Sequence, residues 1–272
     1  EFIIIPLFVL MGQFATAGGL SQDLYKAFNV WLGNLPGGLG LATIGACGAF
    51  AAICGSSLAT AAAMSKVALP EMQRYKYDPR LATGTIAAGG TLGILIPPSV
   101  IMVLYGILTE TSVADLFIAG IIPGLLLVLF FMITIWLLAF LNPTLGPRGP
   151  RSKFKEKIKA FRGVWGTILL FIIVLGGIYT GIFTPTEAAG IGAFGALGLG
   201  LFAGKMNKAS FIQALLDSVD TTAMVFTILI GAIVFKNLIA LLRFPEMIEN
   251  WMLALSLSPM GVLTLILIIY IL

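Results

Sequence analysis

The chain has 272 residues, of which 59% are apolar and only 10% are charged, and its net charge is +4. Soluble domains carry roughly 25% charged residues, so this composition indicates an all-α protein that crosses a membrane several times. The sequence contains no histidine, which excludes serine–histidine catalysis and most transition-metal sites. The basic residues gather between apolar runs, so the positive charge indicates membrane topology and argues against nucleic-acid binding. We therefore expect a membrane protein that is neither an enzyme nor bound to a cofactor.

Residues 1–38 predict a scaffold span followed by an arm helix at the membrane interface. The apolar run over residues 2–18 ends at Gly18-Gly19, and residues 20–35 then place apolar side chains at helical spacing, with polar ones mostly opposite. This pattern is typical of an amphipathic helix that lies along the membrane surface. The run begins at residue 2 without an initiator methionine, so we expect the chain to be a fragment that lacks both ends of a longer protein.

Residues 39–72 predict a re-entrant helical hairpin. Two apolar legs, 39–54 and 58–69, flank the small polar tip Gly55-Ser56-Ser57. Each leg is shorter than the roughly 20 helical residues that cross a bilayer core of ~30 Å. The hairpin should therefore enter the membrane, turn near its middle and return to the same side.

Residues 80–108 are long enough to span the bilayer, but they predict a helix broken at its middle. The interrupting residues are Gly89, Gly90, Gly93, Pro97 and Pro98. We expect the glycines to loosen the helix, while the prolines remove amide donors and push Ile96 out of the helical region. Breaks within a membrane persist only where protein or a watery cavity covers them. Two interrupted elements close together in sequence therefore indicate the binding site of a transporter.

The two breaks offer groups suited to a cation and an anion. Carbonyls that end a helix carry partial negative charge, and amides that begin one carry partial positive charge. We expect the carbonyls near Ile53–Gly55 and Gly90–Ile94 to face a cation, and the amides of Ser56–Leu58 and near Ser99 to face an anion. Hydroxyl oxygens would come from Ser56, Ser57, Thr60 and Thr91. The alternative is that these small residues only let helices pack closely.

The rest of the chain predicts further spans separated by loops. The spans are expected at residues 116–141, 163–183, 186–204 and 218–242, with an amphipathic segment at 245–257 and the start of a second hairpin at 259–272. The span at 186–204 carries small residues at four-residue steps, which favour close approach of another helix. These residues are Ala188, Gly192, Ala196, Gly200 and Gly204.

Residues 143–162 hold seven basic residues and a single acid, Glu156, and we interpret them as a solvated cytoplasmic loop. Counting crossings from this loop places seven further basic residues on the same side, provided that the hairpin returns to its own side. These are Lys26, Lys66, Arg74, Lys76, Arg80, Lys205 and Lys208. Only Lys236 and Arg243 fall elsewhere.

Residues 20–39 and 243–262 are similar at an offset of 223 positions, which aligns Pro36 with Pro259 and Gly38 with Gly261. Each copy follows a span and precedes an apolar run. Five predicted crossings lie between the copies, and an odd number inverts the second one, as in inverted-repeat transporters.

Three segments carry a resemblance to a known family: LPGGLGLATIGACGAFAAICGSSLATAAAMSKVALPEM, YDPRLATGTIAAGGTLGILIPPSVIMVLYGILTETSVADLFIAGIIPG and GIFTPTEAAG. Their order and spacing resemble the large membrane (permease) subunit, DctM-like, of tripartite ATP-independent periplasmic (TRAP) transporters, over essentially the whole chain. The resemblance implies an elevator-type transporter that imports a small carboxylate, such as a C4-dicarboxylate, sialic acid or another sugar or organic acid, together with sodium across the bacterial inner membrane. It also implies a small four-span membrane subunit and a periplasmic substrate-binding protein as partners, with sodium as coupling ion and no other cofactor.

The resemblance also implies site residues. Sodium ligands would fall on Gly55, Ser56, Ser57, Gly90, Thr91, Gly93 and Pro97, and substrate contacts on Ser57, Thr60, Pro98 and Ser99. Residues 39–142 would form the moving transport unit, and residues 1–38 and 163–258 the scaffold. The alternative is a divalent-anion/sodium symporter of related fold that works without a binding protein. A channel would need a continuous polar stripe, and no predicted span shows one.

Overall fold

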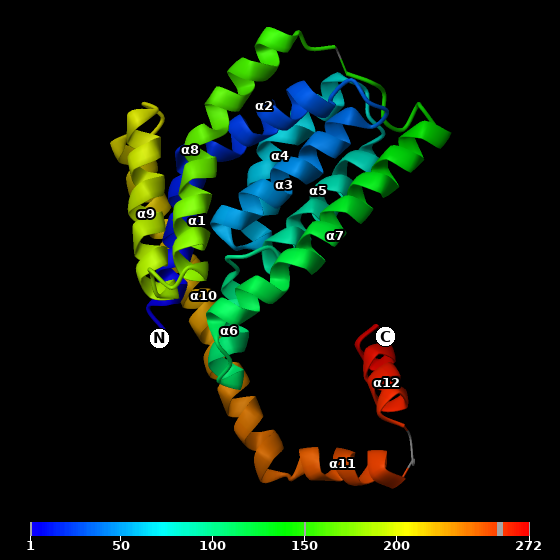
Figure 1. Ribbon diagram of the computed structural model, residues 1–272, viewed down its shortest axis with the longest axis vertical. Helices are drawn as coiled ribbons and strands as arrows, with labels where there is room; N and C mark the ends of the chain where they lie inside the picture. The colour runs from blue at the N-terminus through cyan, green and yellow to red at the C-terminus, as the bar shows by residue number, and fades with distance from the viewer. Residues whose placement is uncertain (1, 150, 255–257, 272) are drawn as a thin grey trace. The chain divides into compact units, whose positions relative to one another are not determined.

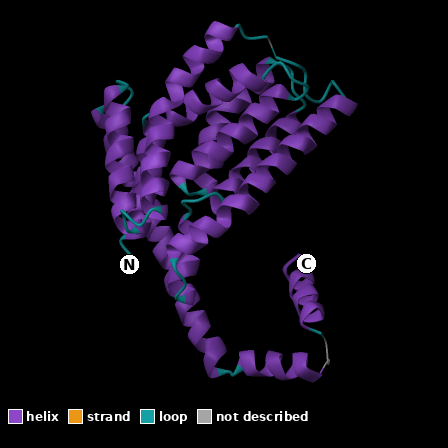
Figure 2. Ribbon diagram, in the orientation of Figure 1, coloured by secondary structure: helices purple, strands orange, loops and turns teal. Residues whose placement is uncertain are grey.

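The computed structural model describes residues 2–149, 151–254 and 258–271, and within these ranges the regular elements are all α-helices (Figure 2). They are α1 (Ile4–Ala17), α2 (Leu20–Leu32), α3 (Gly38–Cys54), α4 (Ser57–Arg74), α5 (Pro79–Leu95), α6 (Val100–Thr109), α7 (Val113–Leu141), α8 (Phe154–Tyr179), α9 (Pro185–Phe202), α10 (Lys208–Leu241), α11 (Phe244–Ala254) and α12 (Pro259–Ile271). The predicted helical class is confirmed.

Among the described residues, four helical segments are long and apolar enough to cross a membrane: α5 with α6 taken together, α7, α8 and α10. The bent pair α1–α2 would add a fifth if it is taken as one segment. The chain divides into two compact units, residues 1–222 and 223–272. The second unit holds α11, α12 and the end of α10, and the candidate site lies entirely in the first. Helix α9 occupies the predicted place of the span at 186–204, but it is not among these spans.

Within the first unit, α3, α4, α5 and α7 pack side by side, and α9 packs against both α1 and α8 (Figure 1). Helix α2 bends away from α1 by 63°, because Gly19 adopts a φ of 73° that only glycine reaches easily. The side chain of Lys205 lies over Gly19 and forms an ion pair with Asp23 at 2.6 Å. Helix α1 ends at Ala17, so the first helix ends at Gly18-Gly19 as the sequence predicts.

The small residues of α9 allow the close approach that their spacing predicts. Ala188, Gly192, Ala196 and Gly200 are all buried, and a Cβ on Gly200 would come within 3.1 Å of the Cα of Gly18 in α1. Gly204 does not belong to this face, because it lies beyond the end of the helix with a φ of 65°. A capping box between Thr184 and Glu187 begins α9.

The predicted hairpin is present as α3 and α4. The turn between them is short because Gly55 adopts a φ of 59°, and the extended Ser56 then accepts a hydrogen bond from the amide of Ala59 through its hydroxyl at 3.3 Å. At the open end of the hairpin, the Tyr77 hydroxyl accepts a hydrogen bond at 3.1 Å from the amide of Leu39, the second residue of α3. Burial raises the pKa of Tyr77 to about 12, so this hydroxyl stays neutral at physiological pH.

The predicted break after α5 is also present, but the glycines act differently from the prediction. Helix α5 continues through them to Leu95, Ile96 is extended with a ψ of 122°, and Ser99 caps the start of α6. Gly89, Gly90 and Gly93 are buried within regular helix, so they do not loosen it. The prolines alone end α5, because they cannot donate and they restrict Ile96.

The glycines of α5 instead bring the two breaks into contact. A Cβ on Gly93 would lie 2.6 Å from the carbonyl carbon and oxygen of Ser56, and one on Gly90 would lie 3.2 Å from the carbonyl oxygen of Ser57. The tip of the hairpin therefore rests directly on the backbone of α5, a few residues before that helix breaks.

The interpretation of residues 143–162 as a loop is wrong in its second half. Helix α8 begins at Phe154, not near residue 163, because the Glu156 carboxylate accepts a hydrogen bond from the Lys153 amide at 2.8 Å and completes the first turn. Similarly, α10 begins at Lys208, where a span was expected only from residue 218.

The contact at Gly93 predicts opposite effects for two substitutions in one helix. Gly93→Ala places a methyl group on the backbone of Ser56, which no side-chain rotation can relieve, and should lower the free energy of unfolding by about 1–3 kcal/mol. Gly84 has no heavy atom within 4 Å of its Cβ position, so Gly84→Ala should raise it by about 0.5–1 kcal/mol. Thermal unfolding of the full-length protein in detergent measures both, and a Gly93→Ala protein as stable as Gly84→Ala would contradict the contact.

Candidate functional site

The two breaks share a hydrogen bond. The amide of Val100, the first residue of α6, donates to the carbonyl oxygen of Gly55 at 3.1 Å. A Cβ on Gly55 would come within 2.7 Å of the carbonyl oxygen of Pro98. The end of α3 and the start of α6 are therefore fixed to each other through backbone groups that neither helix satisfies alone.

Most hydroxyl groups at the breaks already hold a backbone group. The Thr60 hydroxyl is fully buried, donates to the Ser56 carbonyl at 2.8 Å and lies 3.0 Å from the sulfur of Cys54. The Ser99 hydroxyl, also fully buried, accepts from the amide of Met102 at 3.4 Å. The Thr91 hydroxyl donates to the carbonyl of Ala88 at 2.7 Å on the exposed side of α5.

Ser57 differs from these residues. It is half-buried at the tip of the hairpin, and its hydroxyl makes no hydrogen bond within the described ranges. Its carbonyl oxygen lies at the contact with Gly90. Ser57 is therefore the side chain at the tip that is free to coordinate an ion or a substrate.

Some amides at the two helix starts are likewise without a described acceptor. In α4, Thr60 donates to Ser56 and Ala59 to the Ser56 hydroxyl, which leaves the amides of Ser57 and Leu58. In α6, Val100 and Met102 are satisfied, which leaves the amide of Ile101. Free amides at a helix start are suited to an anion.

The structure thus brings together most of the residues predicted for the site and separates a few. Those at the contact of the two breaks are Gly55, Ser56, Ser57, Gly90, Gly93, Pro98 and Ser99. Pro97 is buried in the same break, whereas Thr91 and Thr60 direct their hydroxyls to their own helix turns. All of these assignments stay predictions of ligand contact.

Gly12 of α1 was not found from the sequence. A Cβ on Gly12 would lie 2.7 Å from the Cα of Cys54, the last residue of α3, so α1 packs closely against the end of α3 beside the tip. A single glycine within an apolar span gives no sequence signal for such a contact.

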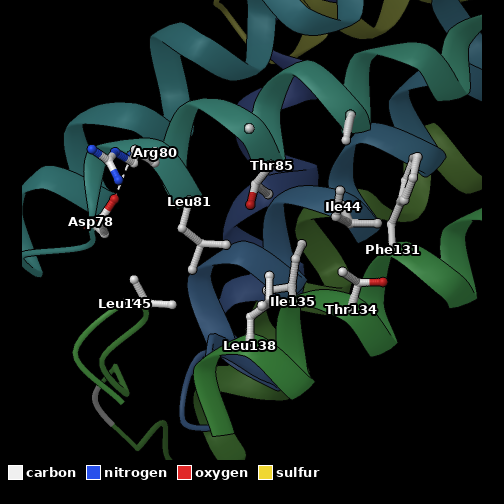
Figure 3. Close-up of a pocket in the computed structure, with 12 residues that line it drawn as sticks. Ile44, Asp78, Arg80, Leu81, Thr85, Phe131, Thr134, Ile135, Leu138 and Leu145 are labelled. Atoms are coloured by element: carbon white, nitrogen blue, oxygen red, sulfur yellow. Dashed lines mark hydrogen bonds between the residues drawn. The ribbon is translucent and has the colours of Figure 1, made fainter. Parts of the chain in front are cut away.

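A pocket of about 400 Å³ lies between α5 and α7, on the side of α5 away from the hairpin tip (Figure 3). Figure 3 shows Ile44, Leu81 and Ile135 around it, with Asp78 and Arg80 at one end. The lining is mostly apolar and the Asp78 carboxylate lies beside Arg80, accepting from its amide at 2.8 Å. This pocket is poorly suited to a carboxylate.

Comparison with known proteins identifies the family of this chain. The sequence matches the family described as the tripartite ATP-independent periplasmic transporter, DctM component, over residues 1–272. It is 41% identical over 259 residues to the C4-dicarboxylate TRAP transporter large permease protein DctM of Pseudomonas aeruginosa, covering 94% of this chain and 60% of that protein.

Two further relatives carry other substrate names. The isethionate TRAP transporter permease protein DctMQ of Oleidesulfovibrio alaskensis is 38% identical over 96% of this chain and 41% of its own length. The sialic acid TRAP transporter large permease protein SiaM of Vibrio cholerae is 33% identical over 97% of this chain and 62% of its own length.

The chain spans about three fifths of the length of the large permeases that it matches. These relatives are named as permease proteins of TRAP transporters. With its long apolar helices, the chain is part of a multi-pass protein of the bacterial inner membrane. It belongs to the family of DctM components, the large permease subunits of tripartite ATP-independent periplasmic transporters.

Proposed function

We propose that this chain forms part of the pathway for sodium-coupled import of a small carboxylate, as the permease subunit of a TRAP transporter. The observation that carries the proposal is the direct contact of two helix breaks, through Gly55 with Val100 and through Gly93 with Ser56. Two apposed breaks concentrate opposite helix-end dipoles at one place, which suits the joint binding of a cation and an anion.

Sodium would be held on the carbonyl side of the breaks. The proposed ligands are the seven residues that the resemblance to TRAP permeases implies. Among their side-chain oxygens, only the Ser57 hydroxyl makes no hydrogen bond within the described residues. The carbonyl of Gly55 accepts one hydrogen bond, from the amide of Val100, and keeps a second lone pair for a cation. The carbonyl of Ser56 already accepts from both the amide and the hydroxyl of Thr60, so it would have to exchange one of these bonds to bind the ion. Ser57 therefore contributes most among the hydroxyls.

The carboxylate would face the amides that lack an acceptor, those of Ser57, Leu58 and Ile101. The relatives are named for C4-dicarboxylate, isethionate and sialic acid, all small organic anions, which supports an anionic substrate for this chain. Partial positive charge from two helix starts recognises an acidic group without selecting one anion. Selection would then rest with a periplasmic substrate-binding protein, which we propose as a partner together with a small four-span membrane subunit.

The proposed movement is of the elevator type, with residues 39–142 moving against the scaffold of residues 1–38 and 163–258. The proposed inverted repeat would relate α2 and α11, which lie within the two similar segments at 20–39 and 243–262. A divalent-anion/sodium symporter is the alternative, and a requirement for added binding protein in proteoliposome uptake distinguishes the two.

Ser57→Ala should weaken sodium coupling without weakening the fold. Loss of one side-chain ligand whose partner stays buried is worth about 1–3 kcal/mol, so the sodium concentration for half-maximal uptake should rise between about fivefold and a hundredfold. Uptake of labelled substrate by the full-length protein with its partners, at varied sodium, measures it.

Ser65→Ala is the matched control, because Ser65 lies on the same helix, is half-buried like Ser57 and donates only to the carbonyl of Ala62 at 2.8 Å. Ser56→Ala should instead lower the free energy of unfolding by about 1 kcal/mol, because it removes the cap of α4. An unchanged sodium dependence in Ser57→Ala would reduce the tip to a packing turn.

The proposed orientation predicts which loops face the outside. With Cys47 and Cys54 replaced, a cysteine introduced at Thr111, in the exposed loop before α7, should react with a membrane-impermeant thiol reagent in intact cells. The same holds for Ser112, whereas a cysteine at Ser152, in the basic segment, should react only after the cells are opened. Labelling of the Ser152 position from outside would reverse the orientation.

A further inference from the structure

Helix α8 is longer than the membrane core requires. Its 26 residues extend about 39 Å at 1.5 Å per residue, whereas a bilayer core is ~30 Å thick. The excess of about 9 Å corresponds to roughly six residues. The first six residues of α8, 154–159, can therefore reach into the layer of lipid headgroups when the apolar remainder crosses the core. Arg162 lies less than one turn further along, and its long side chain can extend back to that layer.

The start of α8 carries two exposed stripes side by side. Phe154, Ile158, Phe161 and Trp165 are 72%, 51%, 59% and 59% exposed and follow one another at steps of four, three and four, which places them on one helix face. Lys155, Lys159 and Arg162 are also exposed and repeat the same steps one residue later. Because successive residues turn by about 100°, the basic stripe runs directly beside the apolar one.

The positive charge of this stripe is not neutralised by the protein. Within the described residues, no carboxylate forms an ion pair with Lys155, Lys159 or Arg162. The nearby acid, Glu156, is used as the cap of the first turn, where it accepts from the amide of Lys153. Lys157 lies on another side, 5.0 Å from the centre of the Trp31 ring of α2, so α8 and α2 are joined where the stripe begins.

We propose that residues 154–165 form a binding surface for anionic phospholipids. The ammonium and guanidinium groups of the basic stripe contact lipid phosphates, and the apolar stripe lies among the upper parts of the acyl chains. The apolar stripe continues without interruption into exposed Ile168, Leu169 and Ile172 further along the helix, which face lipid in a membrane-spanning helix. This continuity favours a lipid over a soluble acidic protein, because a soluble protein docked here would end where the bilayer begins.

The test compares lipid selectivity in the full-length protein. Wild-type protein in nanodiscs that mix phosphatidylglycerol and phosphatidylcholine should retain phosphatidylglycerol preferentially when native mass spectrometry counts the bound lipids. Each basic side chain near the surface contributes roughly a fivefold preference, so the triple variant K155Q/K159Q/R162Q should lose at least tenfold. Raised salt should weaken the wild-type preference in the same direction, since the contacts are ionic and exposed.

Two variants make the result specific. K155R/K159R keeps the charge and should keep the preference, and it shows that the stripe tolerates substitution. K66Q/R74Q/K76N also removes three positive charges, from residues predicted to lie on the same side of the membrane as the basic stripe. This control should leave the preference for phosphatidylglycerol unchanged. The proposal is overturned if the first triple variant keeps its preference, if the control triple loses it equally, if salt has no effect, or if the triple variant loses only its association with the small membrane subunit.

Discussion

The structure depends on one requirement, that backbone groups freed by a helix break inside a membrane find partners there. The two breaks of this chain provide partners for each other, since the amide of Val100 donates to the carbonyl of Gly55. This arrangement requires glycine at Gly55 and Gly93, where a Cβ would collide with backbone of the other break. The hairpin tip and the broken helix are consequently a single structural element, although most of α4 and α5 lies between the tip and Gly93 along the chain.

Once the breaks are joined, the roles of the hydroxyl groups follow from geometry. Ser56 and Ser99 each precede a helix and cap it, and Thr60 ties the Ser56 carbonyl to the next turn of α4. These residues keep the helix starts rigid, which a binding site for small ions needs because ligand positions decide affinity. The hydroxyl of Ser57, the residue directly after Ser56, makes no such hydrogen bond within the described residues. Two adjacent serines thus have different roles, one in the fold and one available to a ligand.

The sequence predicts the hairpin and the break because both follow from local rules, the restriction that proline imposes on Ile96 and the shortness of the legs around Gly55. The resemblance to TRAP permeases predicts the family.

The role of Gly93 and the contact of Gly12 with Cys54 could not be predicted, because they depend on which distant backbone segment lies opposite. The start of α8 was predicted too late in the sequence, because a segment with many lysines is typical of a solvated loop. The Glu156 cap and the apolar side chains beside the lysines instead favour a helix from Phe154. The different roles of Ser56 and Ser57 could not be predicted either, because only the geometry of the turn shows which hydroxyl caps the helix and which makes no hydrogen bond.

The distribution of contacts is suited to the proposed movement of residues 39–142 against α1 and its neighbours. The hydrogen bond that joins the breaks, from Val100 to Gly55, and the one that fixes the hairpin tip, from Thr60 to Ser56, both lie inside the proposed moving unit and need not change during transport. Helix α1 contacts that unit at Gly12, which lies against Cys54, and at Phe8, whose ring packs edge-on against Phe117 with 6.0 Å between the ring centres. These contacts are apolar and involve no hydrogen bond. Apolar contacts of small and aromatic residues can be exchanged for others at little cost in free energy, whereas each broken buried hydrogen bond would cost about 1–3 kcal/mol. A lipid-bound start of α8, joined to α2 through Lys157 and Trp31, would hold the scaffold at a fixed depth while the unit that carries the breaks slides past it.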